Sequence, residues 1–247
     1  MFELHNCVIA LLLFCGAVLY TSVGHAGASA YIAIMTLFDL PAIVIKPTAL
    51  TLNIAVSSFS SWRYINRGFF NRKLLLLLSI GAVPAAFVGG HIHVADTIYK
   101  PILGVLLLLS GVRFIVQSQQ SDKNPQKVIP ALAVLIGLCI GLLSGITGTG
   151  GGIFLSPLII WLGWTNVRQA SGTVAAFIFL NSVAGLLGNF ASTKSLPTVL
   201  PLFLVAVLAG ALIGTRFGTT RFSHSGIKRA LGAVLIVAGI KFLLVLA

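Results

Sequence analysis

The sequence predicts an all-α, polytopic integral membrane protein of about ten helical segments, eight long and two short, arranged as two inverted repeats of five segments. Three observations carry this prediction. Apolar stretches recur along all 247 residues, charged residues are scarce, and each half contains a glycine-rich interruption. We expect residues 1–116 to form the first repeat, 117–127 a polar cytoplasmic linker, and 128–247 the second repeat.

The composition excludes a soluble protein. Hydrophobic residues make up 57% of the chain and charged residues 8%, with a mean hydropathy of +1.06. Soluble domains carry about 25% charged residues, so this chain cannot cover a water-exposed surface. The lipid bilayer is therefore its expected surroundings.

Ten apolar segments follow one another along the chain. The first resembles a signal peptide, but Glu3 and the absence of Lys or Arg before the apolar run favour a retained helix. The segments cover residues 6–22, 28–38, 41–62, 74–90, 98–116, 128–147, 152–163, 166–190, 197–217 and 227–247.

Two of the ten segments are too short to cross a membrane alone. Segments 28–38 and 152–163 span roughly 16–18 Å at 1.5 Å per residue, against a hydrocarbon core of about 30 Å. Each begins at a glycine-rich interruption, so we expect each helix to start inside the membrane.

The two halves look like copies of each other. Residues 103–114 align without gaps on residues 231–242. Three further pairs align in order, which favours a duplication over chance similarity. These pairs are Gly24 with Gly148, Thr48 with Thr173, and Gly89 with Gly214.

The basic residues predict how the halves face. Arg63, Arg67, Arg72 and Lys73 follow the third segment, whereas the basic cluster of the second half follows its fourth segment. With five segments per half, the halves are antiparallel, 12 of the 16 Lys and Arg residues lie on the cytoplasmic side, and both termini face outward. If the short segments only dip into the membrane, the halves are parallel. The basic residues then divide about nine against seven between the two sides of the membrane, which the positive-inside rule disfavours.

The same rule explains the net charge of +12, which could otherwise suggest nucleic-acid binding. We expect no nucleic-acid partner. Cys7, Cys15 and Cys139 lie in apolar runs without paired spacing, and we interpret them as small buried hydrophobic residues. No His-rich metal motif is present, so we expect no metal and no cofactor.

The run Gly145-Ile-Thr-Gly-Thr-Gly-Gly-Gly152 has a degenerate copy, Ser22-Val-Gly-His-Ala-Gly-Ala-Ser29, in the first half. A glycine-rich turn that enters a helix presents free backbone N–H groups and the positive end of the helix dipole, which together bind anions. The alternative is close helix packing through small residues. Three consecutive glycines exceed what packing needs, so we favour an anion site.

The stretch 141–158, followed by Ala170-Ser-Gly-Thr173, resembles the TauE/SafE sulfite exporter family. The resemblance implies a membrane carrier of small sulfur-containing or carboxylate anions, such as sulfite and sulfonates. The first-half copy departs from the glycine-rich form at His25, Ala26, Ala28 and Ser29.

Several residues near the interruptions are candidate substrate ligands, each with a structural alternative. Thr48, Thr173, Asn53 and Asn181 could bind a substrate oxygen or satisfy freed backbone groups. Lys46 and Arg168 could be anion ligands or lie at the membrane interface. The candidate set is Gly24, His25, Gly27, Lys46, Thr48, Asn53, Gly148, Thr149, Gly150, Gly151, Gly152, Arg168, Thr173 and Asn181.

His25 could titrate near neutral pH, although a packed, hydrogen-bonded histidine is the alternative. Asp39 is the candidate for proton coupling, with a helix-end carboxylate as its alternative. A passive anion channel and a non-transporting scaffold or accessory subunit stay open beside the carrier, whereas an intramembrane enzyme lacks clustered catalytic groups. The expected partners are a small anion and the lipid bilayer, with homo-oligomerisation left open.

Overall fold

The computed structural model describes residues 2–92 and 126–219, together with residues 101, 104–105, 107–109, 111–112, 236, 240 and 243. All regular structure in this part of the chain is helical. The helices are α1 (Phe2–Thr21), α2 (Ala28–Leu37), α3 (Ala42–Asn66), α4 (Arg72–His91), α6 (Pro130–Thr147), α7 (Gly152–Trp161), α8 (Val167–Gly188) and α9 (Leu200–Thr219), with a short 3-10 helix, η1 (Phe190–Ser195).

The prediction of an all-helical, polytopic membrane protein is confirmed. In the described residues, six helices are long and apolar enough to cross a membrane, namely α1, α3, α4, α6, α8 and α9. The two short segments form α2 and α7, each 10 residues long and each starting at the predicted residue. Segments 98–116 and 227–247 and most of the linker lie outside the ranges described.

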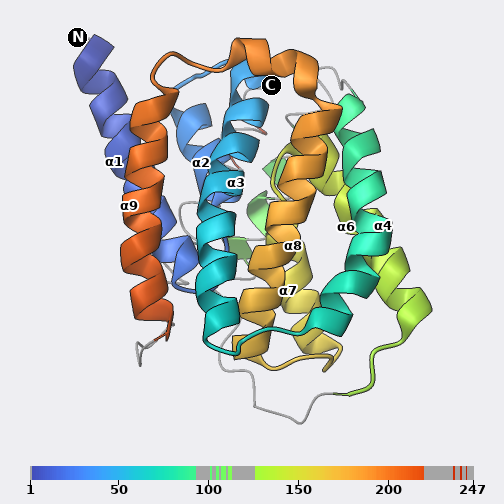
Figure 1. Ribbon diagram of the computed structural model, residues 1–247. Coiled ribbons are helices and arrows are strands. Elements are labelled where there is room, and N and C mark those ends of the chain that lie inside the picture. Colours follow the sequence, from blue (N-terminus) through green and yellow to red (C-terminus); the bar gives the residue numbers. More distant parts are fainter. Residues whose placement is uncertain are drawn as a thin grey trace.

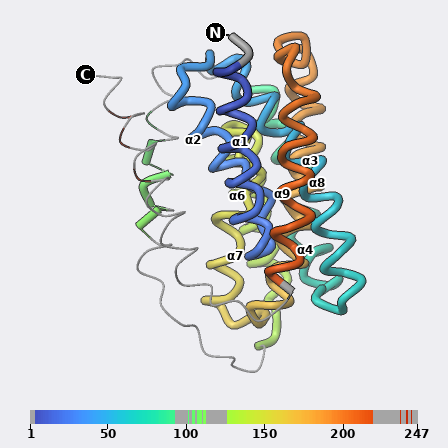
Figure 2. Tube along the Cα trace, turned by 90° about the vertical axis from the view of Figure 1, so that its left-hand side faces the viewer, coloured from blue at the N-terminus to red at the C-terminus, as the bar shows by residue number. Residues whose placement is uncertain are grey.

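The long helices form a bundle around the central pair α3 and α8. In Figure 1, α1, α3 and α9 run downward, and α4, α6 and α8 run upward. Helix α1 packs against α9, and α4 packs against both α6 and α8. The short helices lie on one side of the bundle, α2 above α7, as Figure 2 shows. Both start near mid-height and point in opposite directions (Figure 1).

Glycine allows two of these helix pairs to approach closely. A Cβ on Gly89 of α4 would overlap the backbone carbonyl oxygen of Leu142 on α6, and a Cβ on Gly214 of α9 would overlap that of Val18 on α1. Gly89 aligns with Gly214, and the alignment of Gly24 with Gly148 pairs Val18 with Leu142. The two contacts occupy aligned positions, and each joins one half of the chain to the other.

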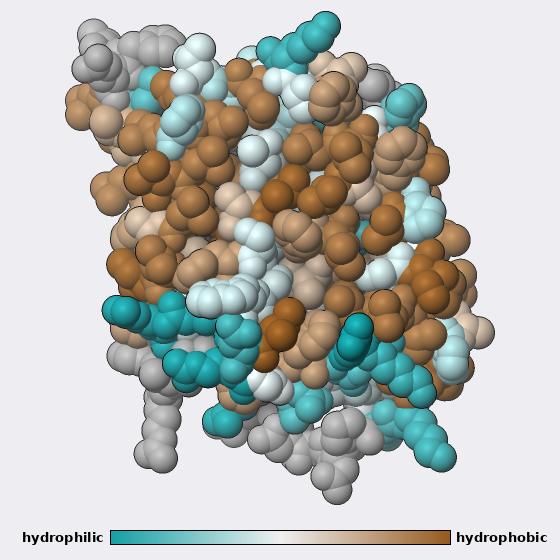
Figure 3. Space-filling view, in the orientation of Figure 1, coloured by the Kyte–Doolittle hydropathy of each residue, from teal (hydrophilic) through white to brown (hydrophobic). Residues whose placement is uncertain are grey.

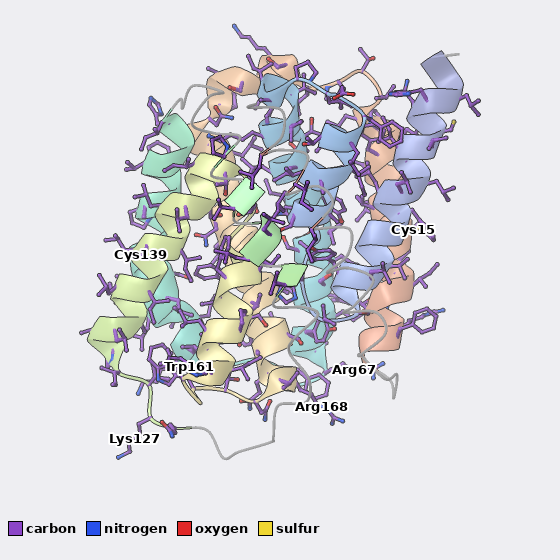
Figure 4. The ribbon with its side chains drawn as sticks, turned by 180° about the vertical axis from the view of Figure 1, so that it is seen from behind. Cys15, Arg67, Lys127, Cys139, Trp161 and Arg168 are labelled. Carbon is purple, nitrogen blue, oxygen red and sulfur yellow. The ribbon has the colours of Figure 1, made fainter. Side chains whose placement is uncertain are left out.

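Apolar side chains cover the middle of the bundle, and charged ones gather at one end. Figure 3 shows a broad apolar band with hydrophilic residues below it. Arg67, Lys127 and Arg168 lie at this end in Figure 4. We call it the basic end. Lys46, in the first turns of α3, and Lys194, in η1, belong to the opposite end, where α3 contacts η1.

The prediction that the three cysteines are buried is wrong. Cys7, Cys15 and Cys139 are all exposed on the outside of the bundle, and Figure 4 shows Cys15 and Cys139 on its two flanks. All three lie on membrane-spanning helices, so they face the lipid. Hydropathy alone does not distinguish an apolar position that contacts lipid from one that contacts protein.

Candidate functional site

A small cavity lies where the two glycine-rich interruptions meet. Both halves of the chain contribute to its wall. The lining residues are Tyr20, His25, Ala26, Gly27, Ala28, Ser29, Asn53, Thr149, Gly152, Ile153 and Ile178.

The first interruption leads from the basic end to this cavity. Helix α1 ends at Thr21, whose carbonyl accepts a hydrogen bond from the Tyr64 hydroxyl at 3.1 Å. The chain then turns back through Gly24 and Gly27, both with left-handed φ angles of 80° and 111°. The Tyr31 hydroxyl donates to the Ala26 carbonyl at 2.6 Å, which satisfies one of the freed backbone groups.

The second interruption reaches the cavity from the other end. Gly148, Gly150 and Gly151 have φ angles of 78°, 74° and 77°, a conformation that L-residues with side chains rarely adopt. The Thr147 and Thr149 hydroxyls lie 2.9 Å apart and hydrogen-bond to each other. There is also little free space around this segment, because a Cβ on Gly150 would lie 2.5 Å from Asn53 Nδ2.

Two helix N-termini face the cavity. Helix α2 begins at Ala28 and Ser29, and α7 begins at Gly152 and Ile153, and all four residues line the wall. The first N–H groups of a helix have no acceptor within that helix. Each N-terminus also carries roughly half a positive charge. The cavity is therefore a suitable environment for negative charge.

Asn53 of α3 adds a buried amide to this wall. It is fully buried, and its Nδ2 donates to the Thr149 carbonyl at 3.4 Å and to Ser182 Oγ at 3.3 Å. Its Oδ1 is buried and has no hydrogen-bond partner within the described ranges. An unpartnered buried carbonyl oxygen is costly, which marks this side chain as a candidate ligand-binding group.

The first half of the chain contributes more polar side chains to the lining than the second half does. The alignments that pair Gly24 with Gly148 and Thr48 with Thr173 also pair Ser29 with Ile153 and Asn53 with Ile178. All four of these residues line the cavity. The first half therefore supplies most of the polar side chains of the lining, and the second half supplies Thr149 and the more glycine-rich backbone.

His25 is also a lining residue and is 5% exposed. Its Nδ1 lies 3.2 Å from the Val23 carbonyl oxygen, and its ring packs edge-on against Tyr20 with centroids 6.3 Å apart. The geometry fits both a packed histidine and a residue at a binding site.

The structure does not bring the two candidate cations into the cavity. Arg168 is exposed at the basic end, where its guanidinium lies 5.8 Å from the centre of the Phe69 ring. Lys46 is half-buried, and its Nζ donates to the Gly90 carbonyl at 3.3 Å. Neither belongs to the lining.

Eight other candidates also lie outside the lining, namely the interruption residues Gly24, Gly148, Gly150 and Gly151 and four others. Thr173 Oγ1 accepts a hydrogen bond from the Asn71 backbone N–H at 3.0 Å, which fixes the turn before α4. Thr48 and Asn181 are fully buried, and their side-chain polar atoms have no partner in the part of the chain described here. Asp39 is exposed after α2, with a φ of 56°.

Sequence reasoning missed Tyr20 and Ile178 as wall residues, and did not single out Ser29 as a ligand. Tyr20 and Ile178 carry no sequence signal, because apolar residues of spanning helices look alike whichever way they face. Ser29 lies within the degenerate glycine copy, so its position did contain a signal. Across the described residues, no group of three or more His, Cys, Asp or Glu side chains could hold a metal ion.

Six spanning helices and two half-length helices that start at buried glycine turns define a multi-pass protein of the membrane-transporter class. The chain belongs to the Sulfite exporter TauE/SafE family, whose sequence model matches residues 8–242. The resemblance seen in the sequence is therefore confirmed.

Relatives in distant organisms are similar over nearly their whole length. The chain is 37% identical to the probable membrane transporter protein y4hK of Sinorhizobium fredii, over 95% of this chain and 97% of that protein. It is 28% identical to the probable membrane transporter protein YjnA of Bacillus subtilis, over 96% and 98% respectively. No solved structure matches the chain.

Proposed function

We propose that this protein carries a small anion across the membrane, and that the anion binds in the cavity between the two glycine-rich interruptions. The substrate class is sulfite, a sulfonate or a related sulfur-containing or carboxylate anion. The observation that carries the proposal is the convergence of two helix N-termini on one cavity.

The physical argument is the cost of removing an anion from water. Transfer of a bare ion into a low-dielectric interior costs several kcal/mol even after relaxation. The N–H groups at the starts of α2 and α7 can replace the lost water without a formal charge. The cavity is small, which favours a small solute over a large organic molecule.

The two halves are proposed to be inverted repeats, and this gives the carrier its means of alternating access. Matching helices run in opposite directions in Figure 1, and the equivalent contacts of Gly89 and Gly214 support the relation. In such an arrangement the site lies between the repeats, and each repeat can open toward a different side of the membrane.

The proposed orientation puts the basic end in the cytoplasm, in accordance with the positive-inside rule. The N-terminus of α1 then faces outward. We propose the cell membrane, specifically the inner membrane of a bacterium, as the location of the protein. Lipid is its surroundings and the small anion its partner, without nucleic acid.

The test is anion flux into proteoliposomes that contain the purified protein, with radiolabelled sulfite, methanesulfonate and acetate as probes. The parent is compared with Gly151→Ala, at the N-cap of α7, whose Cβ would lie 2.8 Å from Ile140 Cγ2. The matched control is Gly68→Ala, since Gly68 also has a left-handed φ, of 76°, but has open space around it.

We expect flux of at least one probe with the parent and Gly68→Ala, and loss of that flux with Gly151→Ala. Acceleration of uptake by unlabelled anion inside the vesicle identifies a carrier, and its absence identifies a channel. A folded parent that moves none of the three anions overturns the proposal in favour of a scaffold or accessory subunit.

A further inference from the structure

Lys46 is a cation in the first turns of α3, a helix long and apolar enough to span the membrane. No carboxylate forms an ion pair with it in the ranges that the structure describes. A cation within a spanning segment is costly unless a counter-charge or a row of carbonyls compensates it. Among the described residues, its Nζ donates one hydrogen bond, to the Gly90 carbonyl oxygen at 3.3 Å.

That carbonyl belongs to the last turn of α4, which ends at His91. Carbonyls in a last helical turn lack intrahelical donors and carry the negative end of the helix dipole, so Gly90 holds the ammonium in place. An ammonium group has three N–H donors. One is used on Gly90, which leaves two to bind a further acceptor.

The aliphatic part of Lys46 packs directly on the second glycine interruption. A Cβ on Gly148 would lie 3.1 Å from Lys46 Cγ and 3.5 Å from Lys46 Cα. Thr149, the next residue, lines the cavity. Lys46 therefore contacts the chain neighbour of a lining residue, at the end of the molecule opposite the basic end.

The first interruption has an equivalent contact without a charge. The alignment of Thr48 with Thr173 also pairs Lys46 with Ser171. Gly24 packs against Ser171, whose hydroxyl donates to the Val23 carbonyl at 3.2 Å. Ser171 of α8 thus covers the first interruption, toward the basic end. Lys46 of α3 covers the second interruption at the matching position, toward the opposite end.

We propose that Lys46 forms a second anion-binding position, through which the substrate passes between the cavity and the end of the protein that carries Lys194. This inference rests on the proposed function. The ligand is the same oxyanion that the cavity takes, bound by the two remaining N–H donors of Nζ. Ser171, at the matching position beside the first interruption, carries no charge, so the two sides of the cavity differ in affinity for the substrate.

The experiment measures the sulfite concentration that half-saturates flux from each face. Right-side-out and inside-out membrane vesicles expose opposite faces, and radiolabelled sulfite is the probe. Lys46→Gln retains a donor for the Gly90 carbonyl but removes the charge, and Lys46→Arg retains the charge. The control is Lys194→Gln, which removes an exposed positive charge from the same end.

We expect Lys46→Gln to raise the half-saturating concentration about tenfold from the Lys194 face, the effect of losing one charged hydrogen bond, and to change it little from the basic face. Lys46→Arg and Lys194→Gln should match the parent. Equal half-saturation of Lys46→Gln and parent on both faces overturns the inference, as does an equal change in Lys194→Gln. If Lys46→Gln fails to fold, a Lys46→Arg variant with tenfold weaker sulfite uptake on both faces also overturns it. A parent without sulfite flux instead overturns the proposed function.

Discussion

The side-chain amide of Asn53 donates a hydrogen bond to the backbone carbonyl of Thr149 at 3.4 Å, and so joins the central helix of one half to the glycine-rich interruption of the other. The same nitrogen lies 3.3 Å from Ser182 Oγ. This amide therefore contributes both to the position of the second interruption and to the cavity wall.

Replacing Asn53 by alanine should impair both roles. We expect Asn53→Ala to lower the free energy of unfolding by about 1–2 kcal/mol, because the buried Thr149 carbonyl loses its donor. Anion flux should fall at least tenfold. Thermal unfolding in detergent and vesicle flux are the two measurements. Ser58→Ala is the control, because Ser58 is exposed on the same helix and bonds only to the Ala55 carbonyl; a parent-like Asn53→Ala contradicts the assignment.

The cavity can be tested by adding a methyl group at Gly152 and then removing side-chain atoms at Ile178. A Cβ there would overlap the side chain of Ile178, which also lines the cavity. We expect Gly152→Ala to reduce flux strongly, since the added methyl group needs the space of the ligand. The double variant Gly152→Ala/Ile178→Ala should recover part of the flux. Flux in Gly152→Ala that equals the parent's shows that the anion passes elsewhere.

Thr173 is predicted to act on stability and not on the substrate. Its hydroxyl oxygen accepts from the Asn71 N–H, and Thr173 does not belong to the cavity lining. Thr173→Val should therefore lower the free energy of unfolding by about 1–2 kcal/mol and leave the half-saturating anion concentration unchanged. Thr51→Val is the comparison, because Thr51 bonds only to Pro47 in its own helix. A raised half-saturating concentration in Thr173→Val would return this residue to the binding site.

The duplication predicts equal effects at Gly89 and Gly214. Each glycine faces a backbone carbonyl on the neighbouring helix, so a methyl group must push the two helices apart. We expect Gly89→Ala and Gly214→Ala each to lower the free energy of unfolding by about 1–3 kcal/mol. Gly185→Ala is the control, because its Cβ would lie 3.6 Å from the nearest atom. A large effect at one site and none at the other argues against equivalent packing.

The orientation can be tested by thiol labelling. With Cys7, Cys15 and Cys139 replaced by alanine, an impermeant maleimide applied to intact cells should label Lys194→Cys and not Gly68→Cys, because the two positions lie on opposite faces. Lysed cells should label both. The reverse pattern in intact cells contradicts the assignment of the basic end to the cytoplasm.

The helices could be predicted from sequence because lipid imposes both their length and their composition. The starts of α2 and α7 could be predicted because glycine-rich turns interrupt a helix and free its first N–H groups. Both predictions depend on local chemistry, which can be inferred from the sequence without knowledge of tertiary contacts.

Which residues reach the cavity depends on helix rotation, and composition does not reveal it. Asn53 and Asn181 are both asparagines on matching helices, yet only Asn53 lines the cavity. Arg168 is near the second interruption in sequence but lies at the basic end, because α8 starts there and runs away from that end. The exposed cysteines are a third example, since lipid and protein interior select the same apolar residues.

The close helix pairs also constrain how this molecule can change shape. Helices α1 and α9 come from different halves of the chain, and so do α4 and α6, with a glycine facing a carbonyl oxygen within each pair. Neither half of the chain can move as one unit without separating these two closely packed helix pairs. Any large displacement must therefore move each of these helix pairs as a unit, so the moving parts of this protein combine helices from both halves of the chain.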